Sequence, residues 1–225
     1  MIKICIETPY KNEIWKRMKD SQIKISKKNP DFVITYGGDG TILRTENKYP
    51  SVPQIPIRKS HICNSCVGGI DSIEKIKEGL LKGNYRIKEF GKVEAIFGKQ
   101  KLVGLNEIQI HSSDPRKALR FSLQIGKQKF DEIIGDGLVF SSVYGSTAYY
   151  SALGYKPFKE GVRIGFNNTH NIEKINIELK KQAIVKVLRG SGFLLADNQE
   201  KIFKVKEGQS FQVRKSIEKA KFVVF

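Results

Sequence analysis

Hydrophobic and polar positions follow one rhythm up to about residue 85 and a different one beyond it. In the first part, apolar runs alternate with segments of helical spacing. The pattern predicts strands at 2–6, 32–36 and 54–58, and helices at 11–20, 41–48 and 71–81. A polar cap opens the last of these helices, and Gly83 lies just beyond its end. Such alternation predicts a parallel sheet with helices packed against it.

The second part consists of short, mostly alternating segments divided by turn residues such as Gly98, Gly126, Gly190 and Gly208. Its predicted strands are 86–97, 101–111, 119–125, 128–134, 138–143, 173–179, 183–189, 193–196, 202–205, 210–213 and 221–225. Only residues 146–153 have helical spacing. Many short strands predict a β-sandwich or barrel. We therefore expect an α/β N-terminal domain with a parallel sheet (residues 1–85), followed by a β-rich, sandwich-like domain (residues 86–225).

The most informative segment is Gly-Gly-Asp-Gly-Thr at residues 37–41, which directly follows the predicted strand 32–36. Glycines let the backbone turn sharply and approach a ligand closely, with amide groups that can face an anion. A helix that starts here would add an N-terminus, where phosphate is favoured. The pentapeptide is thus either a phosphate-binding loop or an ordinary strand-to-helix turn with a surface aspartate.

Other motifs decide between these two interpretations. Residues 135–137 read Gly-Asp-Gly, residues 145–149 read Gly-Ser-Thr-Ala-Tyr, and an Asn-Glu pair lies between the glycine loop and both of them at 106–107. In this order the motifs resemble the NAD kinase family, and residues 197–199 look like its Asp-Gly-Gln turn. The resemblance spans about residues 30 to 225. The first loop alone is shared with diacylglycerol and sphingoid lipid kinases, but the combination is specific.

The resemblance implies a fold and an activity. The fold is NAD kinase/diacylglycerol kinase-like, with the active site in the crevice between the two domains. The activity is transfer of a phosphoryl group from ATP or polyphosphate to the adenosine 2′-hydroxyl of NAD, which gives NADP. Asp39 matches the base that accepts the hydroxyl proton, and amides of Gly38, Gly40 and Thr41 would hold donor phosphates. Mg²⁺ or another divalent cation would be held mainly by those phosphates.

The resemblance also implies which residues bind the dinucleotide. Asn106 and Glu107 would line the NAD site, where Glu107 can accept hydrogen bonds from hydroxyl groups. Asp136 matches an aspartate expected near the nicotinamide end. The remaining candidates are Thr147, Ala148 and Tyr149 at the adenine and phosphates, and Ile164 and Phe166 as an apolar wall.

The sequence departs from the family pattern in four places. Residues 57–63 replace an Asn-x-Gly-x-Leu-Gly-Phe-like loop, so Arg58 or Lys59 is a candidate substitute ligand for phosphate. Val143-Tyr144 replaces Pro-Thr or Pro-Ser, and Tyr155 replaces the second glycine of a pair. The sequence also ends at residue 225, without a tail that folds back onto the first domain. None of these departures removes Asp39, so we expect an active kinase.

Composition narrows the class of protein further. The 40 Lys and Arg residues against 23 Asp and Glu give a net charge of +17, which attracts polyanions such as nucleotides or nucleic acid. The basic residues are scattered, however, and the longest uninterrupted runs have two residues, as at Lys27-Lys28 and Lys180-Lys181. No helix-turn-helix, zinc-finger or aromatic RNA-binding signature is present. We therefore expect a lysine-rich surface that attracts nucleotides, and no dedicated nucleic-acid role.

Short segments of the sequence bear on the cellular location of the protein and on metal binding. No stretch approaches the roughly 20 apolar residues of a membrane span, and the N-terminus is too polar for a signal peptide. We expect a cytoplasmic protein without membrane contact, assembled as a homo-oligomer, a dimer or a tetramer. His61, Cys63 and Cys66 lie close together, but the chain has no second Cys/His pair to complete a zinc site. We expect reduced thiols there and no protein-held metal.

Three rival interpretations remain open from the sequence. A lipid kinase would share the first glycine loop but would lack the Gly-Ser-Thr-Ala-Tyr segment. A non-enzymatic dinucleotide sensor, or a kinase for another nucleotide, is favoured by the altered 57–66 region and by Tyr144. A nucleic-acid binder would show steep salt dependence of binding. The phosphate donor and the preference for NAD over NADH are left undecided.

Overall fold

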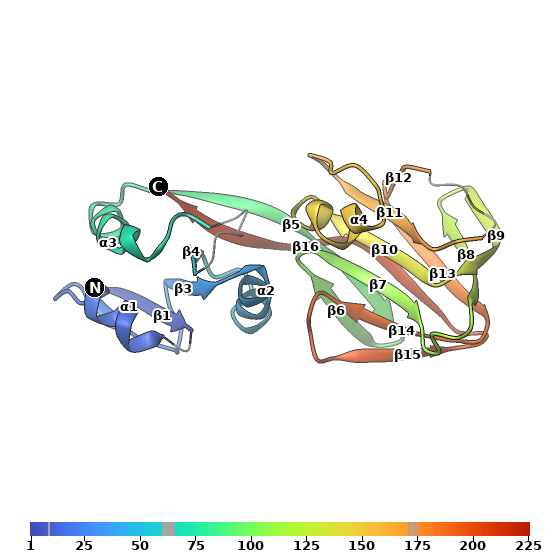
Figure 1. Cartoon of the computed structure of the whole chain (residues 1–225), viewed down its shortest axis with the longest axis horizontal. Helices are drawn as coiled ribbons and strands as arrows, with labels where there is room; N and C mark the ends of the chain where they lie inside the picture. Colours follow the sequence, from blue (N-terminus) through green and yellow to red (C-terminus); the bar gives the residue numbers. More distant parts are fainter. Residues whose placement is uncertain (9, 60–65, 171, 173–174) are drawn as a thin grey trace. The chain divides into compact units, whose positions relative to one another are not determined.

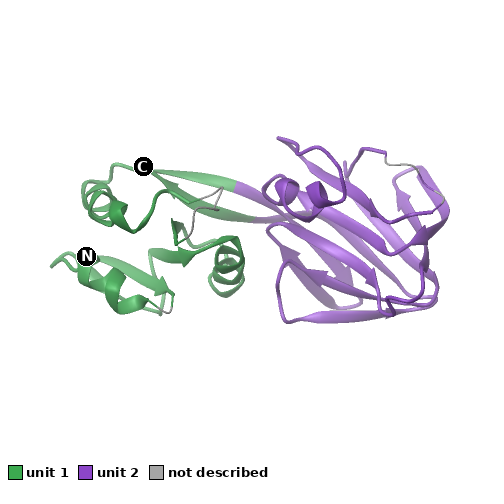
Figure 2. Cartoon of the chain, in the orientation of Figure 1, with its two compact units in different colours: residues 1–89, 219–225 green, residues 90–218 purple. Residues whose placement is uncertain are grey.

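The computed structural model describes residues 1–8, 10–59, 66–170, 172 and 175–225. The chain divides into two units, coloured separately in Figure 2. Unit 1 comprises Met1–Glu89 and Lys219–Phe225, and unit 2 comprises Phe90–Glu218. The first junction lies close to the boundary expected at residues 85 and 86. The last seven residues return to unit 1, so the expectation that the chain lacks a returning C-terminal segment is wrong.

Unit 1 is built on a parallel sheet with strand order β2-β1-β3-β4. The strands are β1 (Ile2–Glu7), β2 (Ile23–Ile25), β3 (Phe32–Gly37) and β4 (Gln54–Arg58), and the helices are α1 (Lys11–Met18), α2 (Asp39–Lys48) and α3 (Ile73–Lys82). Phe222, near the end of the chain, pairs in parallel with Gln54 of β4. Because β1 lies between β2 and β3, the sheet changes direction at the β1/β3 pair, where α/β sheets bind ligands.

The core of unit 1 follows from its apolar pattern. Ile34 in β3 and Ile55 in β4 are fully buried, as expected of parallel strands covered on both faces. α3 buries Ile73, Ile76 and Leu80, the i, i+3 and i+7 positions of one helix face. Gly83 adopts the left-handed conformation (φ 69°) that ends α3, so the predicted glycine stop is confirmed.

Unit 2 contains two antiparallel sheets (Figure 1). In one sheet the strand order is β16 (Ser210–Val224), β13 (Gln182–Arg189), β8 (Leu119–Ile125) and β9 (Gln128–Gly135). A hairpin of β5 (Arg86–Phe97) and β6 (Gln100–Gly104) joins this sheet, because β5 pairs with β16. In the other the order is β12 (Ile177–Glu178), β11 (Val162–Asn167), β10 (Gly137–Ser142), β7 (Glu107–Ser112), β14 (Ser191–Ala196) and β15 (Ile202–Lys206). β5 and β16 each contribute residues to both units.

The two sheets of unit 2 enclose one apolar core. Phe121 and Phe211 from the first sheet and Phe140 and Leu194 from the second are buried in the same cluster. The predicted β-sandwich is therefore confirmed. The outer face of the second sheet carries η2 (Tyr144–Thr147) and α4 (Tyr149–Ala152). Their close packing is visible at Gly165 of β11, where a Cβ atom would contact the side chains of Tyr150 in α4 and of Leu153 just after it.

Several predicted elements have different bounds. The single strand expected at 101–111 is two strands, because the chain turns at 105–106, and the segments 210–213 and 221–225 belong to the one strand β16. α2 begins at Asp39, before the expected residue 41, and β2 was not predicted. Ser72 makes no side-chain cap hydrogen bond, since the chain enters α3 through a short 3-10 turn, η1 (Ile70–Ser72). Part of the strand predicted at 173–179 lies outside the described residues.

Candidate functional site

The glycine-rich turn lies between β3 and α2. β3 ends at Gly37, and Gly38 precedes α2 with an extended backbone (φ −109°, ψ −170°). A Cβ atom at Gly37 would collide with the Thr41 side chain, whereas one at Gly38 would meet nothing within 4 Å. Packing therefore requires glycine at 37, while Gly38 leaves open space into which a ligand can approach the backbone.

Asp39 is the first residue of α2 and lies on the surface of unit 1. Partial burial of its carboxyl group raises the pKa of Asp39 above its ordinary value, which makes the carboxylate a stronger base. The Thr41 amide donates to the Gly38 carbonyl oxygen (2.9 Å), and its role as a phosphate ligand stays a prediction. The Thr41 side chain takes part in a different feature, a cavity beside α2.

A cavity of about 460 Å³ lies at the carboxyl end of β1, at the change of direction in the parallel sheet. Its walls come from the end of β1, the start of α1, Lys27 and one face of α2. The lining residues are Ile6, Glu7, Thr8, Lys11, Lys27, Thr41, Arg44, Thr45 and Lys48. Four of these side chains are cationic and one is anionic, so the lining carries a net charge of +3. Basic side chains and hydroxyl groups around such a cavity suit a phosphate-bearing ligand.

The one acidic residue of this cavity is tied to its wall. One Glu7 oxygen accepts hydrogen bonds from Lys48 Nζ (2.8 Å) and Tyr49 Oη (3.0 Å). These bonds outweigh the effect of burial and lower the pKa of Glu7, so the carboxylate stays ionised. Cys5 is buried beside this pair and contacts Tyr49 Oη at 3.2 Å. Glu7 therefore orients Lys48 and neutralises only part of the positive charge.

Arg58 lies beside the glycine turn, as its predicted role as a phosphate ligand requires. It is the last residue of β4 and is in register with Gly37 of β3. The next residue, Lys59, donates its amide to the Gly37 carbonyl oxygen (3.3 Å), and its ammonium group lies 4.0 Å from the centre of the Tyr10 ring. Lys59 Nζ also contacts Tyr10 Oη. The aromatic contact makes Lys59 the weaker candidate of the two for binding phosphate.

Of the cluster His61, Cys63 and Cys66, the structure describes only Cys66. His61 and Cys63 lie outside the described residues, so the absence of a zinc site there stays a prediction. Cys66 is disulfide-bonded, so the expectation of a reduced thiol at this position is wrong. Among the described residues, no three His, Cys, Asp or Glu side chains are gathered as metal ligands. Within the same described part of the chain, no helix is both long and apolar enough to cross a bilayer.

In unit 2, Asn106 and Glu107 lie at the turn between β6 and β7. Both are buried, and three consecutive backbone amides of this turn, from Leu105, Asn106 and Glu107, donate to the carboxylate of Asp197 (2.7, 2.8 and 3.0 Å). Burial, together with the neighbouring Asp197 charge, raises the pKa of Glu107 to about 8. Asn106 and Glu107 are therefore held rigidly by a residue about ninety positions away in the sequence.

The Gly-Ser-Thr-Ala-Tyr segment packs against the same turn. A Cβ atom at Gly145 would collide with the backbone of Asn106, so only glycine permits this approach. Ser142 donates its amide to the Asn106 carbonyl oxygen (2.8 Å) and its hydroxyl group to the Leu105 carbonyl oxygen (2.5 Å). The structure thus brings together two motifs that lie about forty residues apart. Thr147 and Tyr149 are exposed at the end of this segment, and Ala148 is half-buried.

Asp136 lies in the turn between β9 and β10, flanked by glycines. A Cβ at Gly137 (φ 150°) would collide with the Ile110 carbonyl oxygen, which explains the glycine. The Asp136 carboxylate accepts a hydrogen bond from Asn168 Nδ2 (3.1 Å) and acts electrostatically on His111, whose ring lies 5.5 Å from that of Tyr149. The predicted dinucleotide residues Asp136 and Tyr149 are therefore both neighbours of His111.

Two predicted substrate contacts are wrong. Ile164 and Phe166 of β11 are 0% and 2% exposed, and both belong to the core between the two sheets. Side chains alternate along a strand, so Gly165 between them is the residue that faces outward, towards α4. An apolar wall for a substrate cannot be formed by side chains that are enclosed on the opposite face of the sheet.

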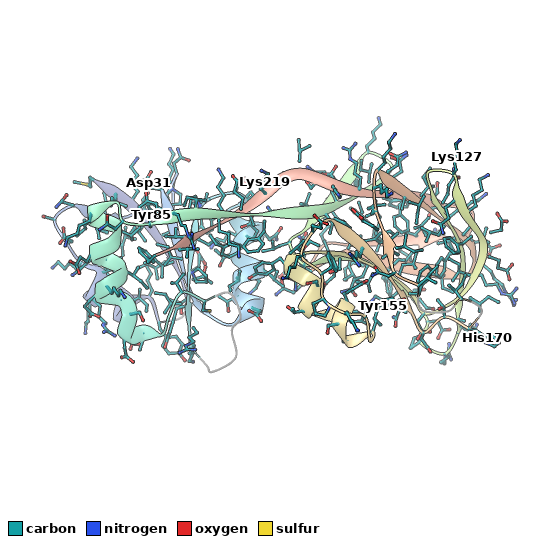
Figure 3. The ribbon with its side chains drawn as sticks, turned by 90° about the horizontal axis from the view of Figure 1, so that it is seen from above. Asp31, Tyr85, Lys127, Tyr155, His170 and Lys219 are labelled. Atoms are coloured by element: carbon teal, nitrogen blue, oxygen red, sulfur yellow. The ribbon has the colours of Figure 1, made fainter. Side chains whose placement is uncertain are left out.

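The two aromatic departures from the family pattern have structural roles. Tyr155 stacks on Tyr150 (ring centres 4.8 Å apart), and its hydroxyl oxygen accepts the amide of Phe166 (3.0 Å). Figure 3 shows Tyr155 beside the ribbon of this helical segment. Tyr144 packs edge-on against Phe90 (5.2 Å). Both rings thus fix η2 and α4 on the sheet.

Three residues of this region were missed by the sequence analysis. Gln109 and His111 follow Glu107 at alternate positions of β7, so all three lie on one face of the strand. The alternation of polar residues is visible in the sequence and was available as a signal. Asp197 was noted only as part of a family-like turn, and nothing local indicates that its carboxylate holds the 105–107 turn.

Comparison with known proteins agrees with these features. No model of a known protein family matches the sequence. The NAD kinase of Methanosphaera stadtmanae is 29% identical over 157 residues, which cover 66% of this chain and 56% of that protein. NAD kinase 1 of Halalkalibacterium halodurans is 29% identical over 159 residues, covering 66% and 59%. The alignments thus span little more than half the length of these curated relatives.

Solved structures give the same answer for the fold. The crystal structure of an NAD kinase from Archaeoglobus fulgidus in complex with ATP has a TM-score of 0.81 at 20% identity, covering 99% of this chain and 93% of that one. Yeast NADH kinase complexed with NADH gives a TM-score of 0.85 at 13% identity, covering 100% and 84%. At these identities the likeness establishes the fold.

A parallel α/β unit with a glycine turn after β3, together with an antiparallel sandwich, defines the fold class of the NAD kinases. The sequence relatives are NAD kinases as well. The chain thus has the fold of the NAD kinases and is similar to them in sequence.

Proposed function

We propose that this protein is an NAD kinase, which transfers a phosphoryl group from ATP or polyphosphate to the adenosine 2′-hydroxyl of NAD and forms NADP. The observation that carries the proposal is the helix α2. Its first residue is Asp39 on a glycine turn, and one of its faces supplies Thr41, Arg44 and Lys48 to the basic cavity. One helix thus offers a base and phosphate-binding side chains, which are the two requirements of phosphoryl transfer.

The donor phosphates bind in unit 1 in this account. Lys11, Lys27, Arg44 and Lys48 neutralise their charge, and the open space at Gly38 admits a phosphate group close to the backbone. Arg58 adds a further cation beside Gly37. A divalent cation is held mainly by the donor phosphates, because the described residues offer single carboxylates and no gathered set of ligands. When bound, the cation neutralises charge on the transferred group.

The dinucleotide binds in unit 2. Asn106 offers both a donor and an acceptor, and the buried turn that carries it is fixed by Asp197, Ser142 and Gly145. Thr147, Ala148 and Tyr149 follow directly, and Asp136 lies near Tyr149 through His111. In the reaction, Asp39 takes the proton of the acceptor hydroxyl group as the new bond to phosphorus forms.

We propose further that the protein acts in the cytoplasm as a homo-oligomer. The support is two exposed apolar side chains at one edge of the second sheet of unit 2, Phe193 (38% exposed) and Ile202 (51% exposed). Apolar side chains on the last two strands of a sheet suit contact with another copy of the chain. Sedimentation of the purified protein, with Phe193→Ser and Ile202→Ser as variants, tests this assignment.

The direct test of the function is formation of NADP. Purified protein is incubated with NAD, Mg²⁺ and either ATP or polyphosphate, and NADP is measured with an NADP-specific dehydrogenase. We expect NADP with at least one donor, and none with Asp39→Asn. Tight binding of NAD without any NADP would instead support a dinucleotide sensor. Phosphorylation of a lipid but not of NAD would support the lipid-kinase alternative.

A further inference from the structure

Asp197 occupies an unusual position in unit 2. It lies just after β14 with a left-handed backbone (φ 47°), a conformation that few residue types other than glycine, asparagine and aspartate adopt readily. Its two carboxylate oxygens accept all three amides of the 105–107 turn. Burial raises the pKa of Asp197 to about 6, and the three amides act in the opposite sense by favouring the ionised form. At neutral pH Asp197 therefore still brings a negative charge into the interior beside Glu107.

The packing around this carboxylate leaves the turn no freedom. A Cβ atom at Gly104 would collide with the Glu107 carbonyl group and would approach Asp197 Oδ1. Asp197 also donates its own amide to the Glu107 carbonyl oxygen (3.1 Å), and Gln199 donates its side-chain amide to the Val103 carbonyl oxygen (2.6 Å). Asp197 is thus the centre of a clamp that fixes both the backbone and the orientation of Glu107.

A row of polar side chains reaches Glu107 from the other side. Gln109 Nε2 donates to Glu107 Oε1 (3.0 Å), so Gln109 Oε1 faces His111 Nε2 (2.6 Å) and must accept its proton. Burial lowers the pKa of His111, which is therefore neutral, and its Nδ1 accepts from Asn167 Nδ2 (3.3 Å). All hydrogen bonds in the row consequently point the same way, towards Glu107.

The second oxygen of Glu107 is different. Oε2 is buried and has no hydrogen-bond partner among the described residues. An ionised carboxylate with such an oxygen, next to the charge of Asp197, would be costly. The pKa of Glu107 is raised to about 8, and burial raises that of Asp197 to about 6, with Lys92 acting in the opposite sense on Asp197. At neutral pH the proton therefore resides on Glu107. Oε1 already accepts a hydrogen bond from Gln109, so the proton lies on Oε2.

We propose that Asp197 is a positioning residue for the acceptor nucleotide and that it makes Glu107 a hydrogen-bond donor to that nucleotide. The proposal rests on the proposed function for the identity of the ligand. A carboxylate that accepts from ribose hydroxyl groups was the expectation for Glu107. The buried Oε2 without a partner, beside the charge of Asp197, reverses this polarity, although the Gln109 hydrogen bond to Oε1 acts in the opposite sense. The recognised group is therefore an acceptor, such as a ribose or phosphate oxygen or a ring nitrogen of the base.

The first test needs no ligand. Infrared spectra of the folded protein are recorded between pH 6 and 10 for wild type, Glu107→Gln, Asp197→Asn and the control Glu200→Gln, whose side chain is exposed. Ordinary carboxyl groups are ionised throughout this range. We expect a protonated-carboxyl band at pH 7 that titrates near pH 8, is absent in Glu107→Gln and is unchanged in Glu200→Gln. If wild type and Glu107→Gln show the same protonated-carboxyl bands, the proposal is overturned.

Asp197→Asn separates charge from structure. Loss of the negative charge should move the Glu107 titration to lower pH, because the like charge no longer opposes ionisation. A variant that loses NAD affinity while its titration stays where it is in wild type would make Asp197 merely structural and would contradict its assigned role. If this variant does not fold, the band in wild type and its loss in Glu107→Gln still decide whether Glu107 is protonated.

The second test measures NAD affinity by calorimetry between pH 7 and 9.5. Loss of one donated hydrogen bond should weaken wild-type binding by about fivefold as Glu107 ionises. In Glu107→Gln the amide group stays a donor, so its affinity should not change with pH over this range. A flat wild-type profile would overturn the donor role. If the protein shows the titrating band but binds no NAD, the proposed function is contradicted, and with it recognition of this nucleotide. If it binds NAD but shows no such band, only the role of Glu107 is contradicted. The two failures are therefore distinguishable.

Discussion

The two units handle charge in opposite ways. In unit 1 the chemically important groups are cations around an open cavity, and the single acid among them, Glu7, is paired with Lys48 and stays ionised. In unit 2 they are buried acids and amides, and the hydrogen bonds of the turn at Asn106 and Glu107 decide which group carries charge. Exposed cations attract a polyanion over some distance and tolerate mobile side chains. Buried groups instead recognise a ligand through fixed geometry and protonation.

This contrast predicts how each unit responds to a perturbation. Substitutions in the cavity of unit 1 should change affinities modestly and in a salt-dependent way. The effects of substitutions in the turn of unit 2 should depend on pH and on how closely the new side chain packs. Asp39 is the exception in unit 1, since it is assigned to the chemical step itself.

The largest effect is expected for Asp39→Asn. The amide keeps the size of the side chain but cannot accept a proton, so turnover should fall by about a thousandfold or more, while NAD affinity stays within about tenfold. Initial rates of NADP formation and calorimetric NAD binding measure the two quantities. Retention of most of the turnover would show that Asp39 is not the base.

The next effect is expected for Gly145→Ala in unit 2. The added methyl group would push into the backbone of Asn106, which should weaken NAD binding by about tenfold or more. Gly91→Ala is the matched control, because a Cβ there meets nothing within 4 Å. Equal NAD affinities of the two variants would mean that the position of Asn106 does not matter for binding.

A pH-dependent effect on stability is expected for Glu107→Gln. The pKa of Glu107 is higher in the folded chain (about 8) than its ordinary value of 4.5, so its contribution to stability is present below about pH 4.5 and is lost as pH rises through 8. The variant cannot ionise. Urea unfolding should therefore give similar free energies at pH 5, and a variant more stable than wild type by about 4 kcal/mol at pH 9. A constant difference across this range would argue against a buried, protonated Glu107.

The smallest effect is expected for the cavity of unit 1. Arg44→Ala should raise the Michaelis constant for ATP or polyphosphate by about five- to tenfold, and the increase should shrink at high salt. Lys75→Ala, an exposed lysine of α3 away from this cavity, is the control. An Arg44→Ala effect that does not depend on salt would point to a structural role.

The same contrast explains what could be predicted from the sequence. The glycine turn, β3 and β4 of unit 1 follow from local patterns, because strand, turn and helix are adjacent in the chain. The polar turn of unit 2 was predicted as part of one long strand, since its break depends on Asp197, about ninety residues away. Ile164 and Phe166 match a family pattern, but strand alternation places them in the core. Contacts between distant residues leave no local signal, and they build most of the second site.

In the proposed function the phosphate donor binds unit 1 and the acceptor nucleotide binds unit 2. Steady-state kinetics with both substrates varied tests this division most directly. Lys48→Ala, from the basic cavity, and Asn106→Ala, from the buried turn, are compared with wild type in NADP formation. We predict that Lys48→Ala raises the Michaelis constant for the phosphate donor alone and that Asn106→Ala raises the one for NAD alone. A crossed result, with Lys48→Ala acting on NAD and Asn106→Ala on the donor, would contradict the account.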